Sequence, residues 1–124
     1  MSGTKTAKIL IADDEASLRF LIHETLADPA LLVLEAQDGT EALQIARSQH
    51  PQMVLLDVAM PGLSGVEVCQ QLKADPATRD IQIVMLTAYS QSKDREQALA
   101  AGADYFITKP FSPTQLFDLI DKIL

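Results

Sequence analysis

Short apolar runs alternate along this chain with longer stretches of helical spacing, and this alternation limits the possible folds more than any other feature. The runs are rich in Leu, Ile and Val and lack strict polar alternation; they lie at Lys8–Ala12, Leu31–Ala36, Met53–Leu56, Ile81–Leu86 and Ala103–Thr108. Such runs are typical of strands that are buried on both faces, as in a parallel sheet.

The stretches between the runs place apolar residues on one side of a helix. The first stretch shows this pattern with Leu18, Leu21, Ile22 and Leu26. The fourth ends at Gly102, a predicted C-cap, and the last begins with Ser112 as a predicted N-cap and Pro113 at the first helical position. Five strands and five helices in strict alternation predict a doubly wound α/β fold with one parallel sheet.

Length and charge narrow the class of protein. The chain has 124 residues, the size of one domain, and we expect a single domain over residues 1–124, either a whole protein or the first domain of a longer one. With 10 Lys and Arg against 17 Asp and Glu, the net charge of −7 argues against direct binding to nucleic acid or to an anionic membrane. One cysteine, and no apolar run long enough for a signal peptide or a membrane span, lead us to expect a cytoplasmic protein.

Polar side chains follow the predicted strands at the edge where ligands bind in doubly wound sheets. Asp13 and Asp14 follow the first run and Asp57 the third. Thr87 and Lys109 follow the fourth and fifth. Clustered carboxylates repel one another unless a cation compensates, and carboxylate oxygens suit Mg²⁺. A carboxylate can also attack phosphorus, with a lysine balancing the developing charge, so the residues predict magnesium-assisted phosphoryl chemistry.

These residues belong to a longer ordered set of motifs. The set comprises Asp13-Asp14, Asp57 after Val54-Leu55-Leu56, Met60-Pro61-Gly62 with Gly65, Thr87-Ala88, Ala103-Asp104-Tyr105 and Lys109-Pro110-Phe111. In this order, from about Lys8 to Leu124, the chain resembles the receiver domain of two-component response regulators, the CheY-like superfamily. The resemblance implies a (βα)5 flavodoxin-like fold with strand order 2-1-3-4-5.

The resemblance also implies roles for single residues. Asp57 would be the phosphoacceptor, and Mg²⁺ would be bound by Asp13, Asp14, Asp57 and the backbone carbonyl of Ala59. Asp13 would reach the ion largely through water. Lys109 would contact the phosphoryl oxygens.

Two further residues would carry the switch that the resemblance implies. Thr87 would move toward the phosphoryl group and Tyr105 would rotate inward behind it. The bond between Lys109 and Pro110 would be cis. The phosphoryl donor would be a histidine kinase or a phosphotransfer protein, and a downstream protein would bind the surface of the fourth helix, fifth strand and fifth helix. The domain would be a signalling phosphoacceptor that acts only on itself, not an enzyme.

Three alternatives remain to be weighed. An aspartyl-phosphate phosphohydrolase would need a second acid two residues after the nucleophile, where Ala59 stands. A flavodoxin-type flavin module would need a phosphate-binding loop after the first strand, where Asp13-Asp14-Glu15 would repel phosphate. A degenerate receiver that binds proteins without phosphorylation is the remaining alternative, and the intact set of acids, Thr87 and Lys109 argues against it.

Some residues have simpler predicted roles. We expect Arg19 to be a surface charge, with a place in the kinase-docking face as the alternative. We expect His23 and His50 to be structural or solvated, and Cys69 to be a small buried side chain. Ala59 and Tyr89 would flank the phosphoryl group. Neither is the commonest residue of the family at its position, and together they predict slow self-dephosphorylation.

Overall fold

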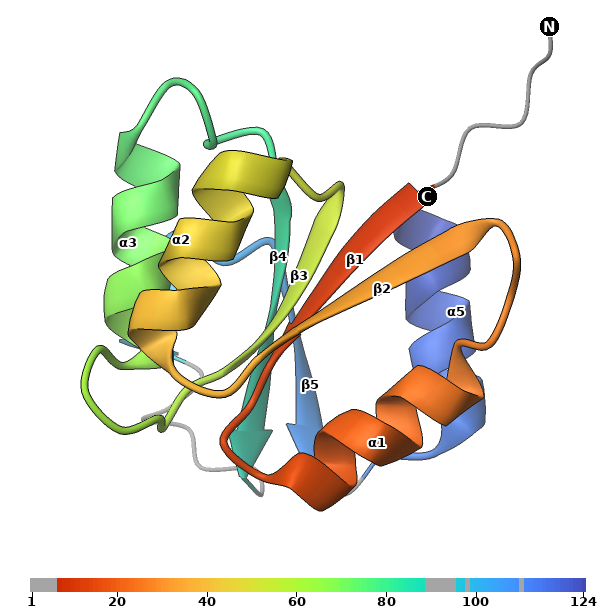
Figure 1. Ribbon diagram of the computed structural model, residues 1–124. Helices are drawn as coiled ribbons and strands as arrows, with labels where there is room; N and C mark the ends of the chain where they lie inside the picture. Colours follow the sequence, from red (N-terminus) through yellow and green to blue (C-terminus); the bar gives the residue numbers. More distant parts are fainter. Residues whose placement is uncertain (1–6, 89–95, 98, 110) are drawn as a thin grey trace, which may run out of the picture.

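The computed structural model describes residues 7–88, 96–97, 99–109 and 111–124, and over these residues it forms one five-stranded parallel sheet with helices on both faces (Figure 1). The strands are β1 (Ala7–Ala12), β2 (Leu31–Ala36), β3 (Met53–Asp57), β4 (Gln82–Ala88) and β5 (Tyr105–Lys109). The described helices are α1 (Ala16–Thr25), α2 (Gly39–Gln49), α3 (Gly65–Ala74) and α5 (Pro113–Ile123). The strand order is β2-β1-β3-β4-β5, so the predicted fold class and strand order are confirmed.

The predicted fourth helix, between β4 and β5, lies partly outside the described residues. Residues 96–97 and 99–100 have helical backbone. The N–H of Ala101 donates to the carbonyl of Gln97, and Gly102 follows with a φ of 96°. A glycine in this left-handed conformation ends a helix, so the predicted C-cap at Gly102 is confirmed.

The ends of two other elements follow from local hydrogen bonds. Ser112 caps α5, because its hydroxyl accepts from the N–H of Gln115 and the Gln115 side chain accepts from the N–H of Ser112. β5 begins at Tyr105 rather than at the predicted Ala103. The difference arises because Asp104 lies in a bend before β5 and is bonded to β4. Its N–H donates to the Ile83 carbonyl and its carboxylate accepts from the Ile83 N–H.

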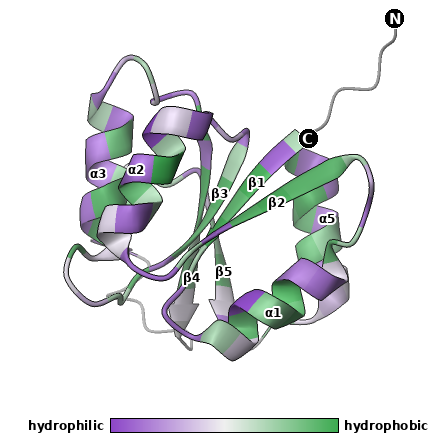
Figure 2. Ribbon diagram, in the orientation of Figure 1, coloured by the Kyte–Doolittle hydropathy of each residue, from purple (hydrophilic) through white to green (hydrophobic). Residues whose placement is uncertain are grey.

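Side chains of the central strands alternate between two cores. In β1, Ile9 and Ile11 pack with α1 and α5, whereas Leu10 and Ala12 pack with α2 and α3. Figure 2 shows the result, an apolar sheet between helices whose apolar stripes face it. None of the described helices is long and apolar enough to cross a lipid bilayer. Burial on both faces leaves the strand ends as the places where polar side chains can gather.

One crevice follows from the topology. β1 lies between β2 and β3, and α1 and α3, which follow the adjacent strands β1 and β3, cover opposite faces of the sheet (Figure 1). When the connections after two adjacent strands run to opposite faces of a sheet, they separate at the carboxyl ends of those strands. Ligands bind at this point in such sheets. The residues at that point are those that follow β1 and end β3.

Candidate functional site

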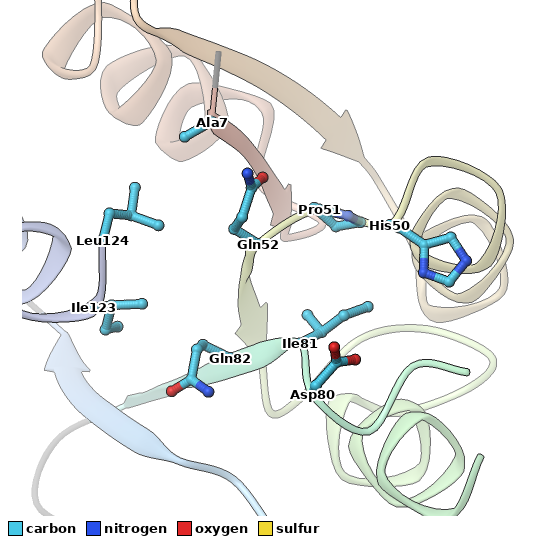
Figure 3. A pocket seen from close by; sticks show the side chains of 9 residues that line it. All are labelled: Ala7, His50, Pro51, Gln52, Asp80, Ile81, Gln82, Ile123 and Leu124. Atoms are coloured by element: carbon cyan, nitrogen blue, oxygen red, sulfur yellow. The ribbon is translucent and has the colours of Figure 1, made fainter. Parts of the chain in front are cut away.

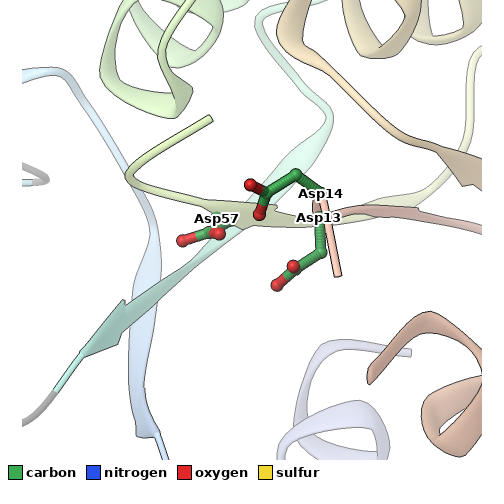
Figure 4. A group of neighbouring side chains, drawn as sticks. All are labelled: Asp13, Asp14 and Asp57. Carbon is green, nitrogen blue, oxygen red and sulfur yellow. The ribbon is translucent and has the colours of Figure 1, made fainter. Parts of the chain in front are cut away.

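Three carboxylates meet at the carboxyl ends of β1 and β3. Asp57 is the last residue of β3, and Asp13 and Asp14 directly follow β1 (Figure 4). Each of the three offers an oxygen, and these oxygens all lie within 4.8 Å of one another. Asp13 and Asp57 are buried, whereas Asp14 is exposed. The predicted carboxylate cluster is therefore present.

Lys109, the last residue of β5, brings an ammonium group to the same cluster. Its Nζ lies 2.8 Å from Oδ2 of Asp13 and 3.5 Å from Oδ2 of Asp57. Burial alone would lower the pKa of Lys109, but the hydrogen bond to Asp13 and the charges of Asp57, Asp13 and Glu15 raise it above its ordinary value. The site therefore favours the charged form of Lys109, which faces the acids.

Hydrogen bonds of both its side chain and its backbone fix Asp13. Its Oδ1 accepts from the N–H of Glu15 at 2.8 Å, its Oδ2 accepts from Lys109, and its own N–H donates to the Ala36 carbonyl. Within the described part of the chain, no hydrogen bond holds the Asp14 carboxylate. The two neighbouring acids therefore differ: Asp13 is fixed by its side chain, and Asp14 is placed by its backbone alone.

Burial makes the charged form of Asp57 unfavourable. Desolvation raises the pKa of Asp57 from 3.8 to about 6, against the opposing effects of Lys109 and the Ala59 N–H. The charges of Asp13 and Asp14 raise it further. A bound cation would favour the charged form of Asp57 and so oppose this effect.

Asp57→Asn should stabilise the metal-free protein near neutral pH. A pKa that rises from 3.8 to about 6 on folding corresponds to a penalty of about 3 kcal/mol above both values, at ~1.4 kcal/mol per pKa unit. The folded protein binds the extra proton between these values, so wild-type stability falls as pH rises through this window. Asparagine, which resembles the protonated acid, removes the penalty.

Urea unfolding in EDTA, from acid to neutral pH, measures this effect. The gain in the free energy of unfolding should be largest at neutral pH and should vanish at acid pH. Asp118→Asn, at an exposed position of α5, is the matched control and should show no such dependence. A gain that is equal at all pH values would contradict the electrostatic cause.

Thr87 contributes a hydroxyl to this edge of the sheet. It follows Leu86, the residue that pairs with Asp57 in the register of β3 and β4. Thr87 is completely buried, and among the described residues its Oγ1 has no hydrogen-bond partner. A buried hydroxyl without a partner costs about 1–3 kcal/mol. Within the part of the chain that the structure describes, this hydroxyl is therefore open to a further hydrogen-bond partner.

The donor set suits a hard divalent cation. The cluster offers carboxylate oxygens, and its described members include no histidine or cysteine. Oxygen ligands and a net negative charge favour Mg²⁺ over zinc or copper. The N–H of Ala59 donates to Oδ1 of Asp57 at 3.3 Å, which places the loop after β3 against the Asp57 carboxylate. The residues present therefore fit the predicted metal.

Gly65 brings α3 directly against the end of β3. A Cβ at this position would lie 1.8 Å from the Asp57 carbonyl oxygen and 3.1 Å from the Cα of Val58. The Gly65 N–H donates to the Val58 carbonyl at 3.0 Å. The sequence motif included Gly65, but it did not show why a glycine is needed. The reason is the close approach of the α3 backbone to the end of β3.

Arg19 corrects one prediction. It is not a free surface charge: its side chain is 15% exposed, and its Nη1 donates to the Asp13 carbonyl. The aliphatic neighbours of Arg19 on α1 gave no sign of this contact, because its partner is a backbone atom. The prediction for Cys69 is confirmed, since the residue is fully buried.

The remaining predicted residues are placed less fully. Tyr105 is half-buried on β5, with the ammonium of Lys122 5.6 Å from the centre of its ring. Tyr89 and Pro110 lie outside the described residues, and with them the predicted cis bond. The inward rotation of Tyr105 stays a prediction.

A separate cavity of about 540 Å³ lies at the opposite edge of the sheet (Figure 3). It is lined by Ala7, His50, Pro51, Gln52, Asp80, Ile81, Gln82, Ile123 and Leu124. Its walls come from the starts of β1, β3 and β4 and from the end of α5, with a single carboxylate among them. Ligands of doubly wound sheets bind at the carboxyl ends of the strands, so the carboxylate cluster is the stronger candidate.

Comparison with known families decides the class of protein. Residues 9–121 match the response regulator receiver domain. The chain belongs to the response regulator receiver family. It is thus a receiver domain of a two-component system, a family of signalling domains that histidine kinases phosphorylate.

Relatives of this receiver domain are transcriptional regulators. It is 45% identical over 117 residues to a probable transcriptional regulator, ycf27, of Porphyridium aerugineum, which covers 94% of this chain and 48% of the relative. It is 41% identical over 116 residues to the phosphate regulon transcriptional regulatory protein PhoB of Pseudomonas aeruginosa, with 94% and 51% covered. The chain therefore spans about half the length of these curated relatives.

Solved structures agree with the family. The receiver domain superposes on the chemotaxis protein CheY4 of Vibrio cholerae with a TM-score of 0.88 at 31% identity, covering 96% of this chain and 99% of that one. For a response regulator of Chloroflexus aurantiacus the TM-score is 0.90 at 30% identity, with 96% and 98% covered. The likeness extends over nearly the whole chain in both cases.

Proposed function

We propose that this receiver domain accepts a phosphoryl group on Asp57 in a Mg²⁺-dependent reaction, from a histidine kinase or a phosphotransfer protein. Mg²⁺ would be held by Asp13, Asp14, Asp57 and the carbonyl of Ala59, with Asp13 acting largely through water. When bound, the ion would neutralise the carboxylates and allow an anionic phosphoryl donor to approach. The domain would then act as a switch for another protein rather than as an enzyme on a separate substrate.

The observation that carries this proposal is the charge imbalance at the strand ends. Three carboxylate oxygens lie within 4.8 Å of one another, and the cation within 4.0 Å of Asp13 and Asp57, among the described residues, is Lys109. The pKa of Asp57 is raised to about 6, mainly by burial and further by the charges of Asp13 and Asp14, against the opposing effect of Lys109. A site built only to be stable would have more cations or fewer acids.

The chain's own residues support a transfer step. An Asp57 oxygen would attack phosphorus as the bond from phosphorus to the donor's nitrogen breaks, and the donor imidazole would leave with its electron pair. Lys109, already 3.5 Å from Asp57, would pair with the phosphoryl oxygens as negative charge builds on them. The hydroxyl of Thr87, which has no partner among the described residues, would donate to a phosphoryl oxygen.

Phosphorylation would then change the surface that a partner binds. A phosphoryl group adds about −1.5 to −2 charge and three acceptor oxygens, and hydrogen bonds that form only in that state shift a two-state equilibrium. Thr87 and Lys109 lie near the ends of β4 and β5, so their movement would reach the segment that follows β4, β5 itself with Tyr105, and α5. That surface would bind a downstream protein. With a net charge of −7, we expect no direct contact of this domain with nucleic acid or membrane.

Intact mass spectrometry after incubation with acetyl phosphate tests the proposal. The protein should gain one phosphoryl group with Mg²⁺ and none with EDTA. Asp57→Asn should gain none in either condition, and Asp118→Asn should behave as wild type. An adduct that survives Asp57→Asn would show that the acceptor is another residue. Absence of both the adduct and Mg²⁺ binding would favour the alternative, a receiver that binds proteins without phosphorylation.

Ala59→Asn should shorten the lifetime of the phosphorylated form by roughly 3-fold or more, less than the 10²–10⁴ of a full general base. Ala59 is exposed two residues after Asp57, and its methyl group can hold no water for attack on phosphorus. A carboxamide there can. Loss of the phosphoryl group with time, followed by mass, measures the rate after removal of acetyl phosphate. Ala59→Leu, similar in shape to asparagine but apolar, should not shorten the lifetime; equal shortening by both would contradict the idea.

A further inference from the structure

Arg19 makes a contact at the site that the charge chemistry above does not use. It lies in the first turns of α1, where its N–H donates to the Glu15 carbonyl. Its side chain turns back toward β1, and Nη1 donates to the Asp13 carbonyl at 2.6 Å. At the cluster the guanidinium therefore holds a backbone carbonyl rather than one of the carboxylates of Asp13, Asp14 and Asp57.

The guanidinium is itself held in place from β2. Its Nε donates to Oε1 of Glu35 at 3.3 Å, and the other oxygen of Glu35 lies 2.8 Å from Nδ1 of His23. Glu35 pairs with Ile11 in the register of β1 and β2, one residue short of the end of β1. A planar guanidinium that is fixed at two of its nitrogens has a defined direction, which a flexible ammonium lacks.

The contact determines the orientation of one peptide plane. The carbonyl of Asp13 and the N–H of Asp14 belong to the same rigid peptide unit. The preceding peptide is fixed as well, because the Asp13 N–H donates to the Ala36 carbonyl. Since no described hydrogen bond holds the Asp14 carboxylate, its position follows from this backbone.

We propose that Arg19 is a positioning residue for the metal site: by holding the Asp13 carbonyl, it fixes the Asp13–Asp14 peptide and so places the Asp14 carboxylate for Mg²⁺. The inference rests on the proposed function, because it gives Arg19 a task in Mg²⁺ binding. Groups that orient metal ligands commonly contribute 10–100-fold to metal affinity.

Charge alone would have the opposite effect. A guanidinium near three carboxylates repels a divalent cation, so its removal would tighten Mg²⁺ binding if Arg19 acted only through its charge. Loss of the hydrogen bond to Asp13 would weaken Mg²⁺ binding. The sign of the change in affinity therefore separates the two roles.

Three variants test the inference by calorimetric titration with MgCl₂. Arg19→Met removes both the charge and the donors, and Arg19→Lys keeps the charge but cannot hold Asp13 and Glu35 with one planar group. Both should raise the Mg²⁺ dissociation constant by about 10-fold. Arg47→Met, which removes an exposed arginine from α2, should leave it unchanged. At saturating Mg²⁺, phosphorylation of the Arg19 variants by acetyl phosphate should return to near the wild-type rate.

The outcomes are distinct. Tighter binding by Arg19→Met with unchanged binding by Arg19→Lys would show a charge effect and overturn the inference, as would unchanged affinity in both. A rate that stays low at saturating Mg²⁺ would also overturn it. If Arg19→Met does not give the wild-type circular dichroism spectrum, Arg19→Lys decides the result. Failure of the wild-type protein to bind Mg²⁺ would instead overturn the proposed function, before any question about Arg19.

Discussion

Replacing Lys109 with methionine should slow phosphoryl transfer to Asp57 by about 100-fold or more and destabilise the metal-free protein by about 3 kcal/mol near neutral pH. The Lys109 ammonium lies 2.8 Å from the buried Asp13 and 3.5 Å from Asp57. Without it, two acids lose their nearest cation and the pKa of Asp57 should rise further. Urea unfolding in EDTA measures the loss of stability, and the rate of mass gain with acetyl phosphate at saturating Mg²⁺ measures the loss of phosphoryl transfer.

Lys109→Arg separates the two roles of this side chain. An arginine keeps the positive charge, so much of the stability should return, but its planar fork differs from an ammonium and phosphoryl transfer should stay slow. Loss of stability should also be smaller at acid pH, where Asp57 is protonated. Transfer at the wild-type rate in Lys109→Met would show that Lys109 holds the acids together without contacting the phosphoryl group.

Gly65→Ala should destabilise the protein by about 3 kcal/mol and weaken Mg²⁺ binding. The added Cβ would lie 1.8 Å from the Asp57 carbonyl oxygen, and the contacted atoms are backbone, so the start of α3 must move away from β3. Alanine has a better helix propensity than glycine by about 1 kcal/mol, so the expected loss opposes the local preference. The same displacement moves the residue that bears the acceptor carboxylate.

Gly62→Ala is the matched control for this contact. Gly62 has a φ of 74°, and a Cβ there would meet no atom within 4 Å. Alanine at this position should destabilise the protein only through backbone strain, by about 1 kcal/mol, and should leave Mg²⁺ affinity unchanged. Urea unfolding and calorimetric titration compare the two variants. Equal effects at both positions would show that α3 can move away from β3 at little cost in the free energy of folding.

The core of the site could be predicted from the sequence because strand ends are easy to locate. Asp57 follows an unbroken apolar run, and the parallel order of the strands brings it beside Asp13 whatever the loops do. Charge also has direct consequences, since clustered acids require a cation. These parts depend on residue type and strand order, and both can be predicted from the sequence.

Contacts with backbone atoms could not be predicted in this way. The partner of Arg19 is the Asp13 carbonyl, and every residue has a carbonyl. The opposite charges of Arg19 and Glu35 were the available signal, but their ion pair can be recognised only once the register of β1 and β2 is known. The start of β5 was predicted wrongly for a similar reason, because Asp104 is bonded to the backbone of Ile83 in β4, which is distant in the sequence.

The order in which the site residues occur along the chain has a consequence for synthesis. Asp57 precedes Lys109 along the chain, and Lys109 reaches Asp13 only after β5 has paired with β4. During synthesis, the carboxylates at the ends of β1 and β3 would therefore leave the ribosome before the cation that faces them. A chain at that stage would hold the acids without Lys109 beside them.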